Sequence, residues 1–203
     1  ADEVICGFGR TGNMWGSDSF DIRPDLVTCA KQLSSAYLPI AALLIGDHVY
    51  QTLADRTDEL GTLGMGYTYG GHPVAAAVAL ETLKIYEEDG IVDHVRAVAP
   101  RFQARLAALA SDPLVGEARG IGLIGALEIV ADKESREQFP ASAKMAATIT
   151  EACLAEGLIL RPLPGDSVGI CPPLVITEDE IDDLFDRLER GLARVHAARR
   201  EAA

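Results

Sequence analysis

The sequence predicts a fold that mixes α-helices with β-strands. Short runs of apolar and β-branched residues, bounded by Gly, Pro or Asp, indicate buried strands, whereas longer alanine-rich or amphipathic stretches indicate helices. The two kinds of segment alternate along the chain, which is the pattern of the α/β class. With 203 residues, 48% of them hydrophobic, the chain is long enough to bury a substantial core.

Three strands and one helix are predicted in the first part of the chain. The strands lie at 4–6, 26–30 and 40–45, and a loop rich in Gly, Ser and Asp joins the first two. An alanine-rich helix is predicted to begin at Pro73, because proline suits the first turn of a helix, and to end near Gly90.

A second helix is predicted from 91 to about 110. Pro100 should kink or divide this helix, because proline lacks the backbone amide donor. We interpret this stretch as the passage between two domains, 1–92 and 93–203.

The second domain is predicted to contain three strands. A bent strand over 119–130 includes several glycines, which allow another backbone to approach closely. Two shorter strands at 158–160 and 168–171 are separated by a turn at 163–166.

Two further helices complete the prediction. One covers 141–156 and is stopped by Gly157. The last helix opens with a capping box formed by Thr177 and Glu180. Its apolar face consists of Ile181, Leu184, Phe185, Leu188, Leu192 and Val195.

The composition disfavours several classes of protein. A net charge of −13 disfavours binding to nucleic acids and anionic membranes, since both would repel the chain. The apolar stretches are too short to span a bilayer and no signal peptide opens the chain, so we expect a cytoplasmic protein. The cysteines have neither the spacing of a disulfide framework nor that of a metal site, and we expect reduced thiols. They are Cys6, Cys29, Cys153 and Cys171.

Two glycine-rich loops could be taken for phosphate sites. The first, 7–12, has the spacing of a dinucleotide fingerprint, but the residues after Gly12 argue against the helix that the fingerprint requires. The second, 64–73, runs directly into the helix at Pro73, so its backbone amides and the Thr68 hydroxyl could bind a phosphate.

A lysine and an aspartate form the first candidate pair for chemistry. Apolar neighbours, among them Val27, Cys29 and Leu33, are expected to desolvate Lys31 partly and so make its neutral amine available as a nucleophile. A carboxylate such as Asp2 would suit the ring nitrogen of pyridoxal phosphate. The alternative is that Lys31 is an ordinary solvated surface charge.

Arg161 is a candidate carboxylate-binding residue. It ends an apolar run and precedes Pro162, an arrangement that would place the guanidinium in a cleft, where it could bind a carboxylate through two hydrogen bonds. A surface ion pair at the end of a strand is the equally open alternative.

Four motifs that occur in one order closely resemble class III aminotransferases, the pyridoxal-phosphate enzymes of fold type I that include the ω-amino acid and amine:pyruvate transaminases. The resemblance runs the length of the chain. It implies the C-terminal half of that fold, in which 1–92 belong to the large cofactor-binding domain and 93–203 form the small domain. The motifs are 2–12, 30–31, 67–73 and 171–174.

The resemblance implies a role for each candidate residue. Lys31 forms the Schiff base with pyridoxal 5'-phosphate and then transfers a proton as general base and acid. Asp2 binds the pyridine nitrogen, and Val4 is a further cofactor contact. Thr68 binds the cofactor phosphate across the interface of a homodimer.

The resemblance also points to the substrates, an amine or ω-amino acid as donor and a keto acid as acceptor. Relatives that use 2-oxoglutarate tend to carry a fixed arginine three residues before the Pro-Pro pair. In this chain that position is Gly169. Arg161 matches the mobile arginine with which amine:pyruvate transaminases bind a keto-acid carboxylate. Pyruvate is therefore the expected acceptor, although diaminopelargonate synthases share an arginine at this site.

We expect the chain to be a fragment. It begins with Ala1-Asp2 rather than methionine, and it lacks the Ser-Gly-Ser phosphate cup and the ring-stacking aromatic residue of the family. The isolated chain should therefore bind cofactor poorly and expose apolar surface. The alternatives are another class III member, either a diaminopelargonate synthase or an aminomutase, a non-catalytic dimerisation module, and a nucleotide-binding oxidoreductase that rests on the first glycine loop alone.

Overall fold

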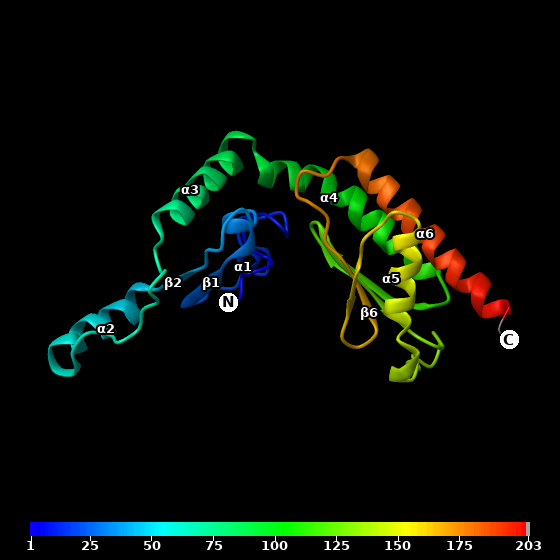
Figure 1. Ribbon diagram of the computed structural model, residues 1–203, viewed down its shortest axis with the longest axis horizontal. Helices are drawn as coiled ribbons and strands as arrows, with labels where there is room; N and C mark the ends of the chain where they lie inside the picture. The colour runs from blue at the N-terminus through cyan, green and yellow to red at the C-terminus, as the bar shows by residue number, and fades with distance from the viewer. Residues whose placement is uncertain (202–203) are drawn as a thin grey trace. The chain divides into compact units, whose positions relative to one another are not determined.

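The computed structural model describes residues 1–201 and divides into two units, the first ending at Asp93 and the second beginning at His94. Figure 1 labels the helices and strands of both units along the chain. Each unit combines helices with β-structure, which confirms the predicted mixed α/β class.

The first unit contains a short antiparallel ribbon and its helices. Strands β1 and β2 pair from Leu26 opposite Ile45 to Cys29 opposite Ala42. Asp2 adds a single parallel bridge to Thr28 of β1. The elements are α1 (Gly16–Ser19), β1 (Leu26–Cys29), the 3₁₀-helix η1 (Lys31–Leu33), β2 (Ala42–Ile45), α2 (Asp47–Leu60) and α3 (Pro73–Glu88).

Two features of the first unit differ from the prediction. The expected strand at 4–6 is wrong, because the chain turns there and the Gly7 amide donates to the Glu3 carbonyl at 2.9 Å. Helix α2 was not predicted. None of its residues is buried, so it lacks the buried apolar stripe by which a helix is recognised in sequence.

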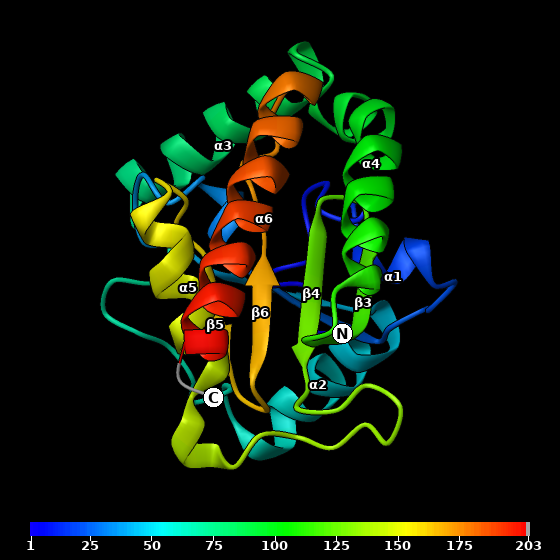
Figure 2. The same cartoon turned by 90° about the vertical axis from the view of Figure 1, so that its right-hand side faces the viewer.

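The second unit is a four-stranded antiparallel sheet in the order β3-β4-β6-β5. In Figure 2, helices α4, α5 and α6 lie over one face of this sheet. The principal elements are α4 (Ile91–Ala108), β3 (Val115–Ile121), β4 (Ile124–Ile129), α5 (Met145–Ala155), β5 (Arg161–Leu163), β6 (Ser167–Ile170) and α6 (Glu178–Glu201), with 3₁₀ turns η2 (Leu109–Ser111) and η3 (Ala141–Ala143).

The core of the second unit lies between the helices and the sheet. Phe102 of α4 and Phe185 of α6 are fully buried, and their ring centroids are 5.3 Å apart. A Cβ on Gly125 would lie 2.5 Å from Leu106 Cδ2, so glycine lets α4 approach β4 closely. The other fully buried large side chains are Leu123, Leu127, Ile129, Ile149, Ile170, Ile181, Leu188, Leu192 and Val95.

Three predictions for this unit need correction. The single bent strand over 119–130 is a hairpin, with Gly122 in the left-handed region at the turn. The strand predicted at 158–160 begins instead at Arg161, where pairing with β6 starts. Helix α4 is not divided at Pro100, and Val95 and Phe102, one on either side of the proline, are fully buried. The alternative of a kink at Pro100 stays a prediction.

The capping box of α6 is confirmed. The Thr177 amide and hydroxyl both bond to Glu180 Oε2, at 2.8 and 2.9 Å, and the Glu180 amide donates to the Thr177 hydroxyl at 3.2 Å. The two hydrogen bonds that its carboxylate accepts lower the pKa of Glu180.

Among residues 1–201, no helix combines the length and apolar character that crossing a bilayer requires.

Candidate active site

Asp2 lies beside the end of strand β1. Its bridge to Thr28 is parallel, and two hydrogen bonds flank it: Glu3 N–H to Thr28 O at 2.9 Å and Thr28 N–H to Ala1 O at 3.0 Å. The exposed Asp2 carboxylate accepts the Val4 amide at Oδ1, at 3.0 Å. The side chain is thus oriented by the local backbone while it stays open to a ligand.

Lys31 follows β1 directly, three residues beyond Thr28. It begins η1 with a φ of 42°, in the left-handed region that a non-glycine residue seldom adopts. Its carbonyl accepts the amides of Ser34 and Ala36 at 3.2 and 3.4 Å. Such strained backbone is found most often at functional sites, where the surrounding structure maintains it.

The expected desolvation of Lys31 is wrong for this chain by itself, because the residue is exposed. Cys29 and Leu33 are buried as expected, at 3% and 8% exposure, but they face into the unit. The apolar run that should have covered the lysine is itself exposed along β2, with Leu43, Leu44 and Ile45 each at 41–46%.

The first glycine loop is bonded to Glu3 through the Gly7 amide and carries no long helix. Turns and bends follow Gly12, and α1 then has only 4 residues. Phe8 is buried, with its ring centroid 5.0 Å from that of Trp15 and 6.4 Å from that of Tyr86. The loop is therefore a packed support beside the candidate site, as the absence of a helix signal predicted.

Thr68 lies in an exposed turn before α3. The Gly70 amide donates to the Tyr67 carbonyl at 2.8 Å, and His72 Nδ1 caps α3 by accepting the Val74 amide at 3.3 Å. Within residues 1–201, no hydrogen bond connects Thr68 to Asp2 or Lys31. The structure therefore brings Asp2 and Lys31 to one end of β1, and it does not bring Thr68 to them.

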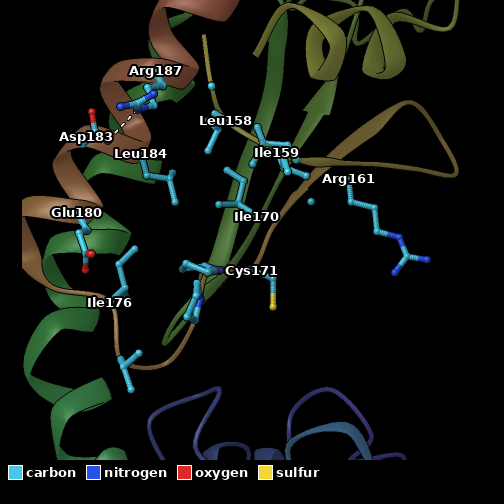
Figure 3. Close-up of a pocket in the computed structure, with 16 residues that line it drawn as sticks. Leu158, Ile159, Arg161, Ile170, Cys171, Ile176, Glu180, Asp183, Leu184 and Arg187 are labelled. Atoms are coloured by element: carbon cyan, nitrogen blue, oxygen red, sulfur yellow. Dashed lines mark hydrogen bonds and ion pairs between the residues drawn. The ribbon is translucent and has the colours of Figure 1, made fainter. Parts of the chain in front are cut away.

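Arg161 belongs to the second unit, where it is exposed at the start of β5. It lies at the edge of a groove of about 790 Å³ between α6 and the strand ends. Figure 3 shows apolar side chains such as Leu158, Ile176 and Leu184 facing into this groove, while the Arg161 guanidinium points away from them. Glu180, Asp183 and Arg187 line the side of α6.

Arg161 and Gly169 are direct neighbours in the sheet of the second unit. Arg161 and Gly169 are Cα partners across the antiparallel pair β5–β6. Directly opposed residues point to the same face, so a side chain at either position emerges at one place. A Cβ on Gly169 would lie 3.0 Å from Leu163 Cδ1, the far end of a flexible side chain.

The cysteines of this chain differ in burial. None is in a disulfide, and Cys153 is fully buried, where desolvation and the Glu156 charge raise the pKa of its thiol to about 11. Cys171 is exposed at the end of β6. Residues 1–201 contain no group of three His, Cys, Asp or Glu side chains arranged to bind a metal ion.

Residues 1–192 match the family model described as aminotransferase class-III. The chain belongs to the class III aminotransferases. This confirms the resemblance drawn from the four motifs.

Curated relatives of this class III chain are similar in sequence and much longer. It is 45% identical over 197 residues to an uncharacterized aminotransferase of Sinorhizobium fredii, which covers 96% of this chain and 42% of the relative. It is 46% identical over 184 residues to gamma-aminobutyrate transaminase 1 of Oryza sativa, 91% of this chain and 36% of the relative. The chain thus spans about two fifths of the length of these relatives.

Solved structures agree closely with the class III chain. A transaminase with L-alanine superposes with a TM-score of 0.93 at 46% identity, over 98% of this chain and 46% of the other. The pyridoxamine-phosphate-bound (PMP) aminotransferase from Vibrio fluvialis gives a TM-score of 0.93 at 41% identity, over 97% and 43%. The predicted transferase fold is confirmed.

Glu3 is the residue of this site that the sequence prediction missed. It is 2% exposed and accepts two backbone amides. No local signal in the sequence identifies it, because its carboxylate is bound by the amides of Gly16 and Ser17, which lie 13 and 14 residues away.

Proposed function

We propose that the protein containing this chain is a transaminase that moves an amino group from an amine or ω-amino acid to a keto acid, with pyridoxal 5'-phosphate attached to Lys31. The observation that carries the proposal is the placement of Lys31 and Asp2 at one end of β1, where Asp2 forms a parallel bridge with Thr28 and Lys31 begins η1 shortly after the strand. Ligands of α/β proteins commonly bind where parallel strands end.

The residues present fit pyridoxal phosphate in their chemistry. An exposed primary amine at Lys31 suits the aldehyde, and an exposed carboxylate at Asp2 suits the ring nitrogen. The bound cofactor supplies an electron sink that stabilises negative charge on the substrate carbon. Family membership and the pyridoxamine-phosphate-bound Vibrio fluvialis relative support the same cofactor.

The residues of this chain then have separate tasks. Lys31 Nζ attaches to the cofactor and, when released, takes up and returns the proton of the substrate carbon. Asp2, oriented by the Val4 amide, accepts a hydrogen bond from the ring nitrogen and keeps it protonated. Val4 is a further contact to the ring, and Thr68 donates to the phosphate from the partner subunit.

Pyruvate is the proposed acceptor, and Arg161 the residue that binds its carboxylate. A guanidinium binds a carboxylate through two parallel hydrogen bonds. Gly169, the cross-strand partner of Arg161, supplies no second guanidinium for a longer dicarboxylate. The transaminase structure with L-alanine supports this acceptor, because alanine is the amino form of pyruvate.

Homodimerisation and a cytoplasmic location are part of the proposal. The segment from β2 to Thr68 exposes large apolar side chains, which favours burial against another chain. None of the four cysteines is in a disulfide, which suits a reducing compartment. The exposed apolar side chains of this segment are Leu43, Leu44, Ile45, Tyr50, Leu53, Leu60, Leu63, Met65 and Tyr67.

Borohydride trapping tests the proposal. The protein as its gene encodes it is loaded with pyridoxal phosphate, reduced and digested, and we expect the mass of the reduced cofactor on the peptide that contains Lys31. Lys31→Ala should abolish both the label and transamination, whereas Lys84→Ala, an exposed lysine of the same unit, should change neither. A label on another lysine would refute the assignment.

A further inference from the structure

The loop after Asp2 is organised around one buried carboxylate, that of Glu3. Its two oxygens accept the amides of Gly16 and Ser17, at 2.9 Å and 2.6 Å, and the residue is 2% exposed. A buried carboxylate is costly unless hydrogen bonds compensate it, and charge-assisted bonds of this length are among the strongest in proteins. These two hydrogen bonds therefore connect Glu3 firmly to the start of α1.

The backbone of Glu3 is engaged at the same time. Its amide donates to Thr28 O of β1, and its carbonyl accepts the Gly7 amide, both at 2.9 Å. A Cβ on Gly7 would lie 2.7 Å from that carbonyl. Glu3 alone thus connects β1, the turn at Gly7 and the start of α1.

The surroundings of Glu3 are built for a close approach. A Cβ on Gly16 would lie 2.7 Å from Cys6 Cβ and 3.0 Å from Glu3 Oε2, so glycine gives the carboxylate room. Burial raises the pKa of the Cys29 thiol of β1, and the charge of Glu3 acts in the same direction. Glu3 is therefore an integral part of the packing beneath the candidate site.

We propose that Glu3 is a positioning residue for Asp2. Glu3 lies between Asp2 and Val4 in the chain. The Asp2 backbone forms the bridge to Thr28, and the exposed Asp2 carboxylate is oriented by the Val4 amide. Removal of the Glu3 carboxylate releases this stretch from α1, and Asp2 loses its fixed orientation. The inference rests on the proposed contact between Asp2 and the cofactor ring nitrogen.

A double-mutant cycle on cofactor affinity tests the inference in the protein as its gene encodes it. The dissociation constant of pyridoxal phosphate is measured for the wild type, Glu3→Gln, Asp2→Asn and the double variant. Gln presents an NH₂ group to one of the two amide donors, so we expect Glu3→Gln to weaken binding about tenfold. Because Glu3 acts through Asp2, the double variant should bind no more weakly than Asp2→Asn alone.

A spectroscopic measurement separates positioning from a general loss of structure. The pH dependence of the bound cofactor's absorption should shift in the same direction in Glu3→Gln as in Asp2→Asn, since both weaken the contact to the ring nitrogen. Glu87→Gln, an exposed carboxylate on α3, should leave affinity and spectrum unchanged. If Glu3→Gln proves insoluble, Glu3→Asp, which keeps the charge but shortens the reach, enters the same cycle.

The outcomes distinguish this inference from the proposed function. Losses that multiply in the double variant, or an unshifted spectrum in Glu3→Gln, would overturn the positioning role while leaving the transaminase proposal intact. Unchanged affinity in Asp2→Asn, together with no label on Lys31, would instead reject the proposed function.

Discussion

Arg161 and Gly169 are opposite residues on neighbouring strands, so a guanidinium at either position leaves the sheet at the same point. We predict that Arg161→Ala raises the KM for pyruvate roughly a hundredfold, because a charge-assisted, two-point hydrogen bond is lost. The KM for an uncharged amine should change little, since that substrate offers no carboxylate. Steady-state kinetics with each substrate varied in turn measure both values.

The register supplies a matched control for this prediction. Arg161→Gly combined with Gly169→Arg moves the guanidinium to the opposite strand, where the nearest neighbours of a Cβ are the flexible end of Leu163 and the Arg161 carbonyl oxygen. The exchange should recover part of the lost affinity for pyruvate. Equal losses for pyruvate and amine in Arg161→Ala would exclude a role in carboxylate binding.

Individual residues of the site were recognisable in the sequence to different degrees. Lys31 and Asp2 could be selected because a Schiff base needs an amine and the ring nitrogen needs a carboxylate, although their roles stay predictions. The sequence left the exposure of Lys31 open as an alternative, because exposure depends on what covers β2, and Leu43 to Ile45 are exposed in this chain. Local sequence does not reveal which chain covers an apolar run.

At the scale of elements, α4 and α6 are connected by a cluster of ion pairs. Arg101 and Arg105 both bond to the Asp182 carboxylate, with Arg101 Nε 2.8 Å and Arg105 Nη1 3.1 Å from Oδ1. The hydrogen bond from Arg101 is the main reason that the pKa of Asp182 is lowered. The ion pair between Arg101 and Asp182 therefore links protonation of Asp182 to the stability of the second unit.

The sign of this linkage gives a prediction. Because the pKa of Asp182 is lower in the folded state, its stabilising contribution is complete above the unfolded pKa and is lost as pH falls through the folded value. Asp182→Asn should thus flatten the acid side of a plot of the free energy of unfolding against pH. Denaturant titrations between pH 2 and 6 measure the effect.

The control for that prediction is Asp179→Asn, an exposed residue in the first turn of α6. It should leave the acid slope closer to that of the wild type. A slope unchanged by Asp182→Asn would mean that the cluster contributes nothing to the pH dependence, as is common for exposed ion pairs.

Elements whose ends carry local sequence signals were predicted best. The boundaries of α3 and α6 were readable because Pro73 and the Thr177–Glu180 box are local signals. The hairpin β3–β4 was taken for one strand, because its reversal at Gly122 needs only two residues. The segment at 4–6 lost its strand to the contacts of Glu3, which lie 13 and 14 residues away.

At the scale of the whole chain, the two units differ in how much of their core they contain. The fully buried large side chains all belong to residues 95–192, in the second unit. In the first unit, every residue from 50 to 74 is exposed, and helix α2 buries nothing. The second unit thus contains a complete apolar core of its own, and apolar burial is the main source of folding stability.

We therefore predict that residues 91–203, which keep α4 whole, fold on their own, whereas residues 1–90 do not. Thermal unfolding followed by circular dichroism should show one cooperative transition for 91–203, because its sheet and three helices share a single core. Residues 1–90 should unfold without a clear transition, since their few buried side chains, such as Phe8 and Tyr86, leave most apolar surface in water. A cooperative transition in 1–90, or none in 91–203, would contradict the division at Asp93 as a boundary between folding units.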